Sequence, residues 1–451
     1  MYLPVIGRLS LVEWPLVVAS FLAVYLEFVI SLITRAIPDS VLDLVTSFIQ
    51  QVHSTIVPEK IKNGHILETA AKKITKDIRK APSIQHIGHL FGYQIDDHIV
   101  PTADGYLLCL HRIRPLKEGA PVVYLHHGLL MCSDIWVVNI KKERNLPFIL
   151  HDMGFDVWMG NNRGNKYSTK HLSLKPSHKR FWDFSIDEFA MYDIPDSINY
   201  ILSYTKQQDL TYIGFSQGSA QAFAALSLHD KLNTQIKLFI ALAPAMTPSG
   251  LHNQFVDTLM KSTPNFMYLA FGKRLLLPTA SFWKNICYPP LFSKIIDLSV
   301  RMLFDWKNYN ITHDQKIAAF SHLYSPTSVK SVVHWFQIIR NGAFQLFDED
   351  VSLTNALSAP FRNASFPTQT NIKVPIKLIY GSIDSLVDID KMLSLLPADI
   401  TDAVAIPNHE HLDIIWGDHI EKLVFPDLFN FLGVDKDTEE ENEKVTALES
   451  C

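Results

Sequence analysis

A serine stands between two glycines in the segment Gly214-Phe-Ser-Gln-Gly218, which separates an apolar run from a run of small residues. We expect residues 209–213 to form a strand and residues 219–225 a helix, so Ser216 falls at a sharp turn between them. Such a turn forces the serine backbone into a strained conformation. The chain tolerates this because the residues two before and two after lack side chains. The motif predicts a nucleophilic serine.

A serine hydroxyl becomes a good nucleophile only beside a base, which a carboxylate must orient. In this chain order both partners follow the serine. Residues 373–380 are apolar and β-branched and predict a strand, with Asp384 just after its C-terminal end. Asp388 and Asp390 lie nearby, but the sequence from Val387 onward favours a helix, so we interpret them as caps or first-turn charges. Asp384 is the predicted acid.

The candidate bases follow the next expected strand, residues 403–407. His409 and His411 both lie in the loop after it, and spacing alone does not separate them. Asp413 is interpreted as a helix cap or a supporting residue rather than as the acid. The acid and the base therefore fall on successive loops after strands, where sites in open α/β sheets gather.

The oxyanion formed by serine attack on a carbonyl needs two backbone N–H donors. The residue after the serine, Gln217, supplies the first. The second should come from the loop after the buried strand 121–125, where Gly128 allows a close backbone approach. Leu129 N–H is our candidate, and Leu130 N–H is the alternative.

The remaining polar motifs indicate no cofactor and no metal. His126 and His127 are interpreted as bracing their loop by hydrogen bonding. Neither a paired cysteine–histidine metal spacing nor a glycine-rich dinucleotide loop is apparent in the sequence. The net charge of -5 and the lack of a basic stripe argue against nucleic acid as a partner.

Cysteine usage indicates a reducing compartment. Four cysteines are scattered without close pairing, at Cys109, Cys132, Cys287 and Cys451. Two glycosylation sequons, at Asn310 and Asn363, would argue for the secretory route, and we attribute them to chance.

With these residues in place, the chain resembles the acid lipase family of α/β-hydrolases, which includes gastric, lysosomal and fungal sterol ester lipases. The resemblance runs from about Pro82 to Leu432 and rests on five ordered motifs, at residues 127–130, 154–165, 181–188, 214–218 and 411–417. In this family the histidine of the His-Leu-Asp segment is the base, which favours His411 over His409. The acid of the Gly-x-x-Asp segment likewise maps to Asp384.

Within the family, the chain is most similar to the yeast sterol esterases of lipid droplets. The similarity includes the start at Met1-Tyr-Leu-Pro and the segment 129–134. One departure is Phe215, where many members carry histidine, and we expect its ring to pack beneath the serine turn without altering the mechanism.

The predicted fold is an α/β-hydrolase with a mostly parallel central sheet, a helical cap inserted before the last core strands, and an N-terminal hydrophobic anchor. The strand expected at 237–244 is separated from the one at 373 by about 125 residues, too many for a loop. This segment is rich in helix-length apolar patterns and in aromatic residues, most of which we expect to form its own core. An apolar underside would suit an acyl chain or a sterol.

The domain organisation follows from these segments. We expect an anchor with an amphipathic helix at 1–58, a linker at 59–81, hydrolase core at 82–245 and 371–433, the cap at 246–370, and an acidic tail at 434–451.

The N-terminus predicts attachment to lipid. Residues Leu16 to Ile33 are mostly apolar and as a helix would reach only about 27 Å, marginal for a bilayer. Basic residues follow this segment, whereas only Arg8 precedes it, which favours a catalytic domain facing the cytosol. Residues 41–52 repeat apolar side chains at helical spacing and indicate an interfacial helix or one packed on the core. We expect a lipid droplet and endoplasmic reticulum location.

The sequence thus predicts a steryl ester hydrolase that acts at a lipid surface, with Ser216, His411 and Asp384 as the triad. A triacylglycerol lipase is the close alternative, because the sequence does not identify the pocket contacts that distinguish a sterol from glycerol. Two more distant alternatives are a non-catalytic structural protein of the droplet and a soluble hydrolase whose apolar N-terminus packs on its core.

Overall fold

The computed structural model describes residues 25, 70–248, 250, 268, 272–276, 287, 289–349 and 364–434. The expected anchor and interfacial helix, the acidic tail, Asn363 and Cys451 lie outside the described residues, apart from Tyr25 and Val434. In the described part of the chain, none of the helices has the length and apolar character that a membrane span requires.

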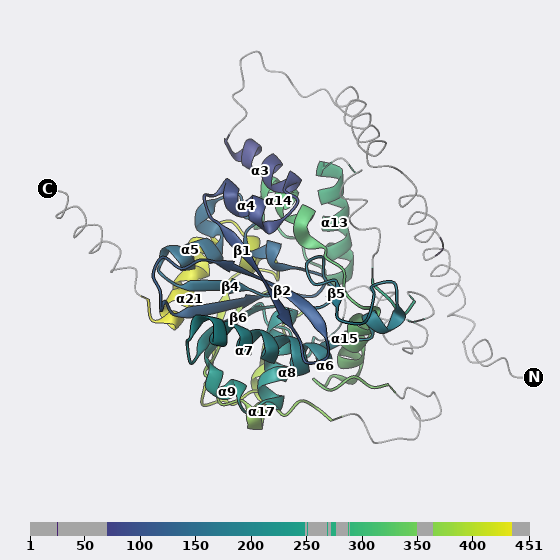
Figure 1. The fold of residues 1–451 in the computed structure, drawn as a ribbon. Coiled ribbons are helices and arrows are strands. Elements are labelled where there is room, and N and C mark those ends of the chain that lie inside the picture. The colour runs from purple at the N-terminus through teal and green to yellow at the C-terminus, as the bar shows by residue number, and fades with distance from the viewer. Residues whose placement is uncertain are drawn as a thin grey trace, which may run out of the picture.

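A nine-stranded sheet forms the centre of the molecule, in the order β1-β2-β4-β3-β6-β7-β8-β9, with β5 paired to β2 (Figure 1). The strands are β1 (Ile95–Pro101), β2 (Tyr106–Ile113), β3 (Val122–His126), β4 (Asp156–Met159), β5 (Lys170–His171), β6 (Leu210–Phe215), β7 (Ile236–Leu242), β8 (Ile376–Gly381) and β9 (Thr401–Ile406). β2 runs antiparallel to β1, β4 and β5, and all pairings from β4 to β9 are parallel. The predicted α/β fold with a mostly parallel sheet is confirmed.

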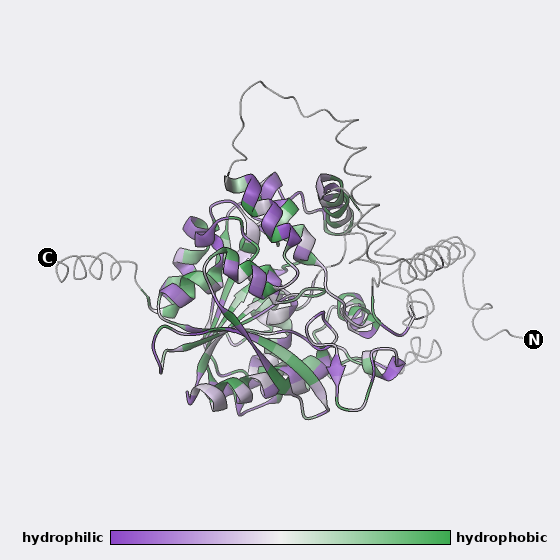
Figure 2. Cartoon of the chain, turned by 45° about the horizontal axis from the view of Figure 1, so that its top comes forward, coloured by the Kyte–Doolittle hydropathy of each residue, from purple (hydrophilic) through white to green (hydrophobic). Residues whose placement is uncertain are grey.

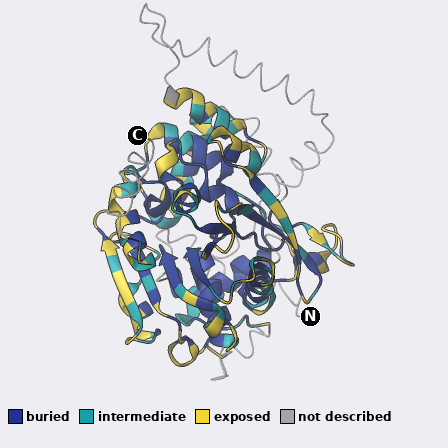
Figure 3. Cartoon of the chain, turned by 60° about the vertical axis from the view of Figure 1, so that its left-hand side comes forward, coloured by how far each residue is buried: buried dark blue, intermediate teal, exposed yellow. Residues whose placement is uncertain are grey.

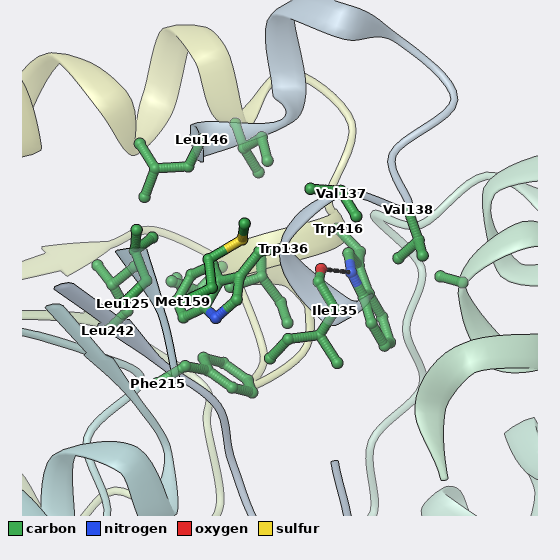
Figure 4. Packing of buried hydrophobic residues seen from close by; sticks show 14 of the residues in the cluster. Leu125, Ile135, Trp136, Val137, Val138, Leu146, Met159, Phe215, Leu242 and Trp416 are labelled. Atoms are coloured by element: carbon green, nitrogen blue, oxygen red, sulfur yellow. Dashed lines mark hydrogen bonds between the residues drawn. The ribbon is translucent and has the colours of Figure 1, made fainter. Parts of the chain in front are cut away.

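Each face of the sheet packs on its own apolar cluster, because successive side chains of a strand point to opposite faces. In β3, Val123 and Leu125 belong to one cluster, whereas Val122 and Tyr124 belong to the other. Figure 4 shows part of the first cluster, in which the indole of Trp416 donates to Ile135 O at 3.0 Å. Green strands at the centre of Figure 2 and dark blue ones in Figure 3 mark this apolar, buried interior.

Helices cover both faces. The first cluster takes residues from α3 (Ala70–Lys80), α4 (Ile84–Leu90), α5 (Leu146–Asp152), α19 (Asp413–Trp416), α20 (Ile420–Leu423), α21 (Phe425–Leu432) and the short helix η2 (Ser133–Trp136). The second takes them from α6 (Ile186–Glu188), η4 (Lys179–Trp182), η5 (Phe189–Asp193), α7 (Ile194–Thr205), α8 (Gln217–Leu228), α9 (Leu232–Gln235) and α18 (Ile389–Ser394). Two further short helices are η3 (Lys142–Arg144) and α17 (Thr368–Asn371).

Between β7 and β8 the chain contributes α13 (Pro289–Phe304), α14 (His313–Leu323) and α15 (Val329–Asn341). α13 and α14 pack on the first cluster and α15 on the second, so the inserted segment lies against both halves of the core. In Figure 1, α13 and α15 lie to the right of the sheet and α14 above it, whereas α5 and α21 lie to its left.

Candidate active site

Ser216 lies between β6 and α8 with φ 53° and ψ −120°, a backbone conformation that side-chain-bearing residues rarely adopt. Its N–H donates to Leu242 O at 3.0 Å, which ties the turn to β7. A Cβ atom on Gly218 would lie 2.3 Å from His126 O, and one on Gly214 would lie 2.7 Å from Gly218 C. The two glycines of the motif are therefore required by close backbone contacts.

Asp384 and His411 follow β8 and β9, and the structure brings them together. His411 Nδ1 lies 2.6 Å from Asp384 Oδ2, and both side chains are buried. Asp384 Oδ1 accepts the Leu386 N–H at 3.0 Å, which fixes the carboxylate. Because a carboxylate only accepts hydrogen bonds, Nδ1 of His411 carries the proton, and Nε2 keeps a lone pair that can accept another.

Aromatic rings hold the His411 imidazole beside the serine turn. The ring of Phe215, the residue before Ser216, lies 5.1 Å from the imidazole, centroid to centroid. Trp306, from the inserted segment, stacks on the imidazole at 4.8 Å with the planes 8° apart, and Phe304 stacks on Trp306 at 4.4 Å. Phe215 thus packs against the His411 imidazole.

His409 has a different role in the same loop. Its Nδ1 lies 2.8 Å from Pro407 O, and its own carbonyl accepts the Ile383 N–H at 3.2 Å, so it braces the loop against the one after β8. Asp413 Oδ2 accepts the N–H of Glu410 at 2.8 Å. The structure pairs His411, and not His409, with Asp384.

The competing acids lie at the start of α18 (Ile389–Ser394). Asp388 is the N-cap residue of this helix and accepts the Lys391 N–H at 3.2 Å, and Asp390 lies in the first turn. These positions agree with their interpretation as a cap and a first-turn charge.

The loop after β3 lies directly on the serine. A Cβ atom on Gly128 would come within 3.1 Å of Ser216 Cβ and 3.3 Å of Phe215 Cδ1. Leu129 is the next residue in the chain. Leu130 adopts φ 59°, and its carbonyl accepts a hydrogen bond from the Ser325 N–H at 2.6 Å. Gly128, the residue before Leu129, thus lies against Ser216, and Gln217 follows the serine at the first position of α8.

The two histidines at the start of this loop, His126 and His127, are uncharged and stabilise it by hydrogen bonding. His127 Nε2 accepts the Asn162 N–H at 3.1 Å, so its Nδ1 carries the proton and donates to Gly128 O at 2.8 Å. Burial lowers the pKa of His127 to about 4. Gln221 Nε2 donates to His126 Nδ1 at 2.7 Å.

A buried charged cluster under this loop was not found from the sequence. Asp134 accepts hydrogen bonds from Lys166, from Tyr167 OH at 2.7 Å and from His322 Nδ1 at 2.8 Å, and His322 Nε2 donates to Ile78 O at 2.8 Å. Since both ring nitrogens of His322 face acceptors, this side chain carries a positive charge. Burial would raise the pKa of Asp134, but the neighbouring cations hold it below its usual range. The cluster joins η2, α14 and α3.

The inserted segment also reaches Gln217, the residue after Ser216. Trp335 of α15 donates from Nε1 to Gln217 Oε1 at 2.7 Å, and both side chains are buried. Trp306 thus contacts His411, and Trp335 contacts Gln217, from two different parts of the insertion. The spacing of these two tryptophans in the sequence does not indicate that they lie near the same site, although both belong to the aromatic residues of the insertion.

One group of side chains with metal-ligand chemistry occurs in the described residues, away from the serine. His111 Nε2 lies 3.3 Å from Asp97 Oδ1 and 3.6 Å from Cys109 Sγ, on strands β1 and β2. Burial raises the pKa of the Cys109 thiol to about 12, which disfavours the thiolate that a metal would need. We interpret the group as a hydrogen-bonded pair beside a thiol.

Comparison with known families places the chain in a class. The alpha/beta hydrolase fold matches residues 121–418, and the partial alpha/beta-hydrolase lipase region matches residues 84–140. The chain belongs to the α/β-hydrolase fold family. Within that family it is a member of the acid lipases, and it is a carboxylic ester hydrolase.

Its relatives are similar over most of their length. A probable lipase of Schizosaccharomyces pombe is 45% identical over 91% of each chain. The human lysosomal acid lipase/cholesteryl ester hydrolase is 36% identical over 74% of this chain and 86% of its own. The gastric triacylglycerol lipase of Bos taurus is 34% identical over 81% of this chain and 94% of its own.

Proposed function

We propose that this enzyme hydrolyses long-chain fatty acyl esters of sterols at a lipid surface through an acyl-enzyme on Ser216. The observation that carries the mechanism is the 2.6 Å contact between His411 Nδ1 and Asp384 Oδ2, beside a serine held at φ 53°. An activated serine with a preset base is the arrangement that acyl transfer needs.

The steps follow from these positions. Ser216 Oγ attacks the ester carbonyl carbon while His411 Nε2 takes the hydroxyl proton, which it then gives to the departing alcohol. Asp384 holds the imidazole and stabilises its charged form. The N–H groups of Leu129 and Gln217 hold the oxyanion. A water molecule, deprotonated by the same histidine, then attacks the acyl-enzyme and releases the fatty acid.

The sterol assignment is supported by two observations. A relative that covers most of this chain carries the name cholesteryl ester hydrolase. The wall beside the base is built of flat aromatic rings from the insertion, including Phe304 and Trp306. Burial of a rigid apolar ring system against such a wall provides binding energy without hydrogen bonds.

Triacylglycerol hydrolysis is the second candidate, because the bovine gastric relative carries that name at similar identity. Both substrates present the same ester carbonyl to Ser216. They differ in the alcohol that leaves, so the same mechanism serves either.

We propose further that the enzyme resides on lipid droplets and the endoplasmic reticulum membrane with its catalytic domain in the cytosol. The apolar segment Leu16–Ile33 and the basic residues after it support this. The free thiols of Cys109 and Cys287 are consistent with a reducing compartment. Retention in the pellet after a carbonate wash, with the catalytic domain open to added protease, is the expected result. Release into the supernatant would overturn it.

The function is tested by fatty-acid release from emulsified cholesteryl oleate and triolein, measured side by side with wild type and Ser216→Ala. Faster turnover of the steryl ester supports the first proposal, and faster turnover of triolein supports the second. A fluorophosphonate should label the wild type and leave Ser216→Ala unlabelled. If the wild type neither reacts with the probe nor releases fatty acid, a structural protein is the better description.

A further inference from the structure

Helix α13 is apolar on two opposite faces. Its inward row, Ser293, Ile296 and Val300, is buried against the core. Its outward row is formed by Leu291, Ile295, Leu298 and Met302, which are 52%, 47%, 66% and 53% exposed. Steps of four, three and four residues keep these four side chains on one stripe, on the side of the helix away from the core.

An exposed apolar stripe of this kind needs a partner. A helix that is apolar on both sides is normally covered on both sides, and contiguous exposed apolar surface marks an interaction site. Leu116 and Leu172 are just as exposed, but they lie in loops outside any helix. Figure 1 shows α13 at the outer edge of the described fold, next to α14.

The charges around the stripe favour one kind of partner. Lys294 and Arg301, seven residues apart, are exposed along one edge of it. The acidic residue of the helix, Asp297, accepts hydrogen bonds from Asn308 Nδ2 at 3.2 Å and from Lys316 Nζ at 2.7 Å, so it is turned toward α14. An apolar stripe with a cationic edge matches a layer of acyl chains under phosphate headgroups.

We propose that the outward face of α13 docks on a phospholipid-covered lipid surface, with Leu291, Ile295, Leu298 and Met302 among the acyl chains and the two cations at the phosphates. This inference rests on the proposed function, because the ester substrate is dissolved in such a surface. The last residue of α13, Phe304, stacks on the tryptophan that stacks on His411. The helix that meets the lipid thus ends beside the catalytic base.

The first test uses the full chain and a variant, Ile295→Gln/Leu298→Gln/Met302→Gln, in which glutamine preserves helix propensity. We expect binding to phosphatidylcholine vesicles containing phosphatidylserine, and turnover of emulsified ester, to fall about tenfold or more. Turnover of a water-soluble short-chain p-nitrophenyl ester should stay at the wild-type level. The matched control, Leu116→Gln/Leu172→Gln, removes equally exposed side chains elsewhere and should bind as the wild type does.

The second test separates α13 from any other lipid-binding segment of the chain. Wild type is photo-cross-linked to vesicles that contain a benzophenone-bearing phosphatidylcholine, and the modified peptides are identified by mass spectrometry. Cross-links within residues 289–304 support the proposal. Cross-links confined to other segments of the chain, with none within residues 289–304, overturn it.

The two proposals fail in different ways. Ser216→Ala should keep wild-type vesicle binding, because the serine takes no part in docking. An inactive wild type that binds vesicles through α13 would sink the catalytic proposal alone. Full activity on soluble and emulsified esters, with no difference between wild type and the triple variant, would sink the docking proposal alone.

Discussion

The indole ring of Trp306 stacks on the imidazole of His411, with the ring centroids 4.8 Å apart and the planes within 8° of parallel. Trp306 comes from the insertion and His411 from the last core loop. Glu410 joins the same two segments, since its carboxylate accepts the N–H groups of Lys307 at 2.8 Å and Asn308. The insertion therefore forms one wall around His411 and limits how its ring can turn.

Replacement of Trp306 by alanine should lower kcat on a soluble short-chain ester about tenfold with little change in KM, because a base that can tilt spends less time in reach of the serine. The indole Nε1–H finds no hydrogen-bond partner among the described residues, so the ring acts by stacking. Trp306→Phe should therefore keep most of the activity. Steady-state kinetics on both variants checks this, and equal losses in the two would contradict a stacking role.

His411→Gln should lower kcat about 10³-fold or more, because it removes the group that takes the serine proton. His409→Gln is the matched control in the same loop. Its wild-type contact is to Pro407 O, so this variant should remain active and lose some stability instead. The rate of fluorophosphonate labelling measures both. Loss of labelling in His409→Gln, with His411→Gln still reactive, would reverse the assignment.

Much of the site was predictable because its constraints are local. The glycines around Ser216 are needed by contacts within one strand-to-helix turn, so they leave a motif in the sequence. Gly381, in the motif of the acid, works in the same way: a Cβ there would lie 2.0 Å from His409 O, so only glycine lets the two loops meet. The choice of His411 over His409 needed a family resemblance, because either spacing fits one loop.

The walls of the site were not predictable from the sequence, because they depend on contacts between distant segments. Trp306 lies more than a hundred residues before His411, and no periodicity links them. The ion cluster joins Asp134 to His322 across 188 positions, and neither residue belongs to a motif of known chemistry. Side chains brought together only by tertiary packing leave no local pattern, so the aromatic wall and the charged cluster required the structure.

Gly128→Ala should slow acyl transfer about 10²-fold. The new methyl group would lie only 3.1 Å from Ser216 Cβ and 3.1 Å from Met131 Sδ. These close contacts should displace the loop that carries the Leu129 N–H. The loss should appear in kcat, since the oxyanion forms only during the reaction. Gly119→Ala serves as a control for the loss of a glycine. A Cβ there has no neighbour within 4 Å, but the φ of 77° strains any side chain, so this variant should lose some stability and keep the wild-type kcat. Wild-type kcat in a folded Gly128→Ala would show that the loop adapts.

Asp187 should make the enzyme less stable as the pH rises. Burial raises its pKa to about 7, although its carboxylate accepts the Phe347 N–H at 2.9 Å. Its Oδ1 lies 3.9 Å from Nδ1 of His334, whose pKa burial lowers to about 4. His334 Nε2 donates to Gln345 O at 2.8 Å, so its Nδ1 carries a lone pair, and a protonated Asp187 suits that neighbour.

The direction of the pH effect follows from proton binding. Between its ordinary pKa of 3.8 and the folded value of about 7, Asp187 holds more proton in the folded chain than in the unfolded one. The free energy of unfolding therefore falls as the pH rises through this range. Asp187→Asn removes this titration, so it should flatten the slope and be the more stable protein at pH 8. Urea unfolding at pH 5 and pH 8 measures this. The control is Asp399→Asn, at an exposed position, and its stability should depend on pH as that of the wild type does. If the stability of Asp187→Asn falls with pH as steeply as that of the wild type, the Asp187 carboxyl is charged in the folded state.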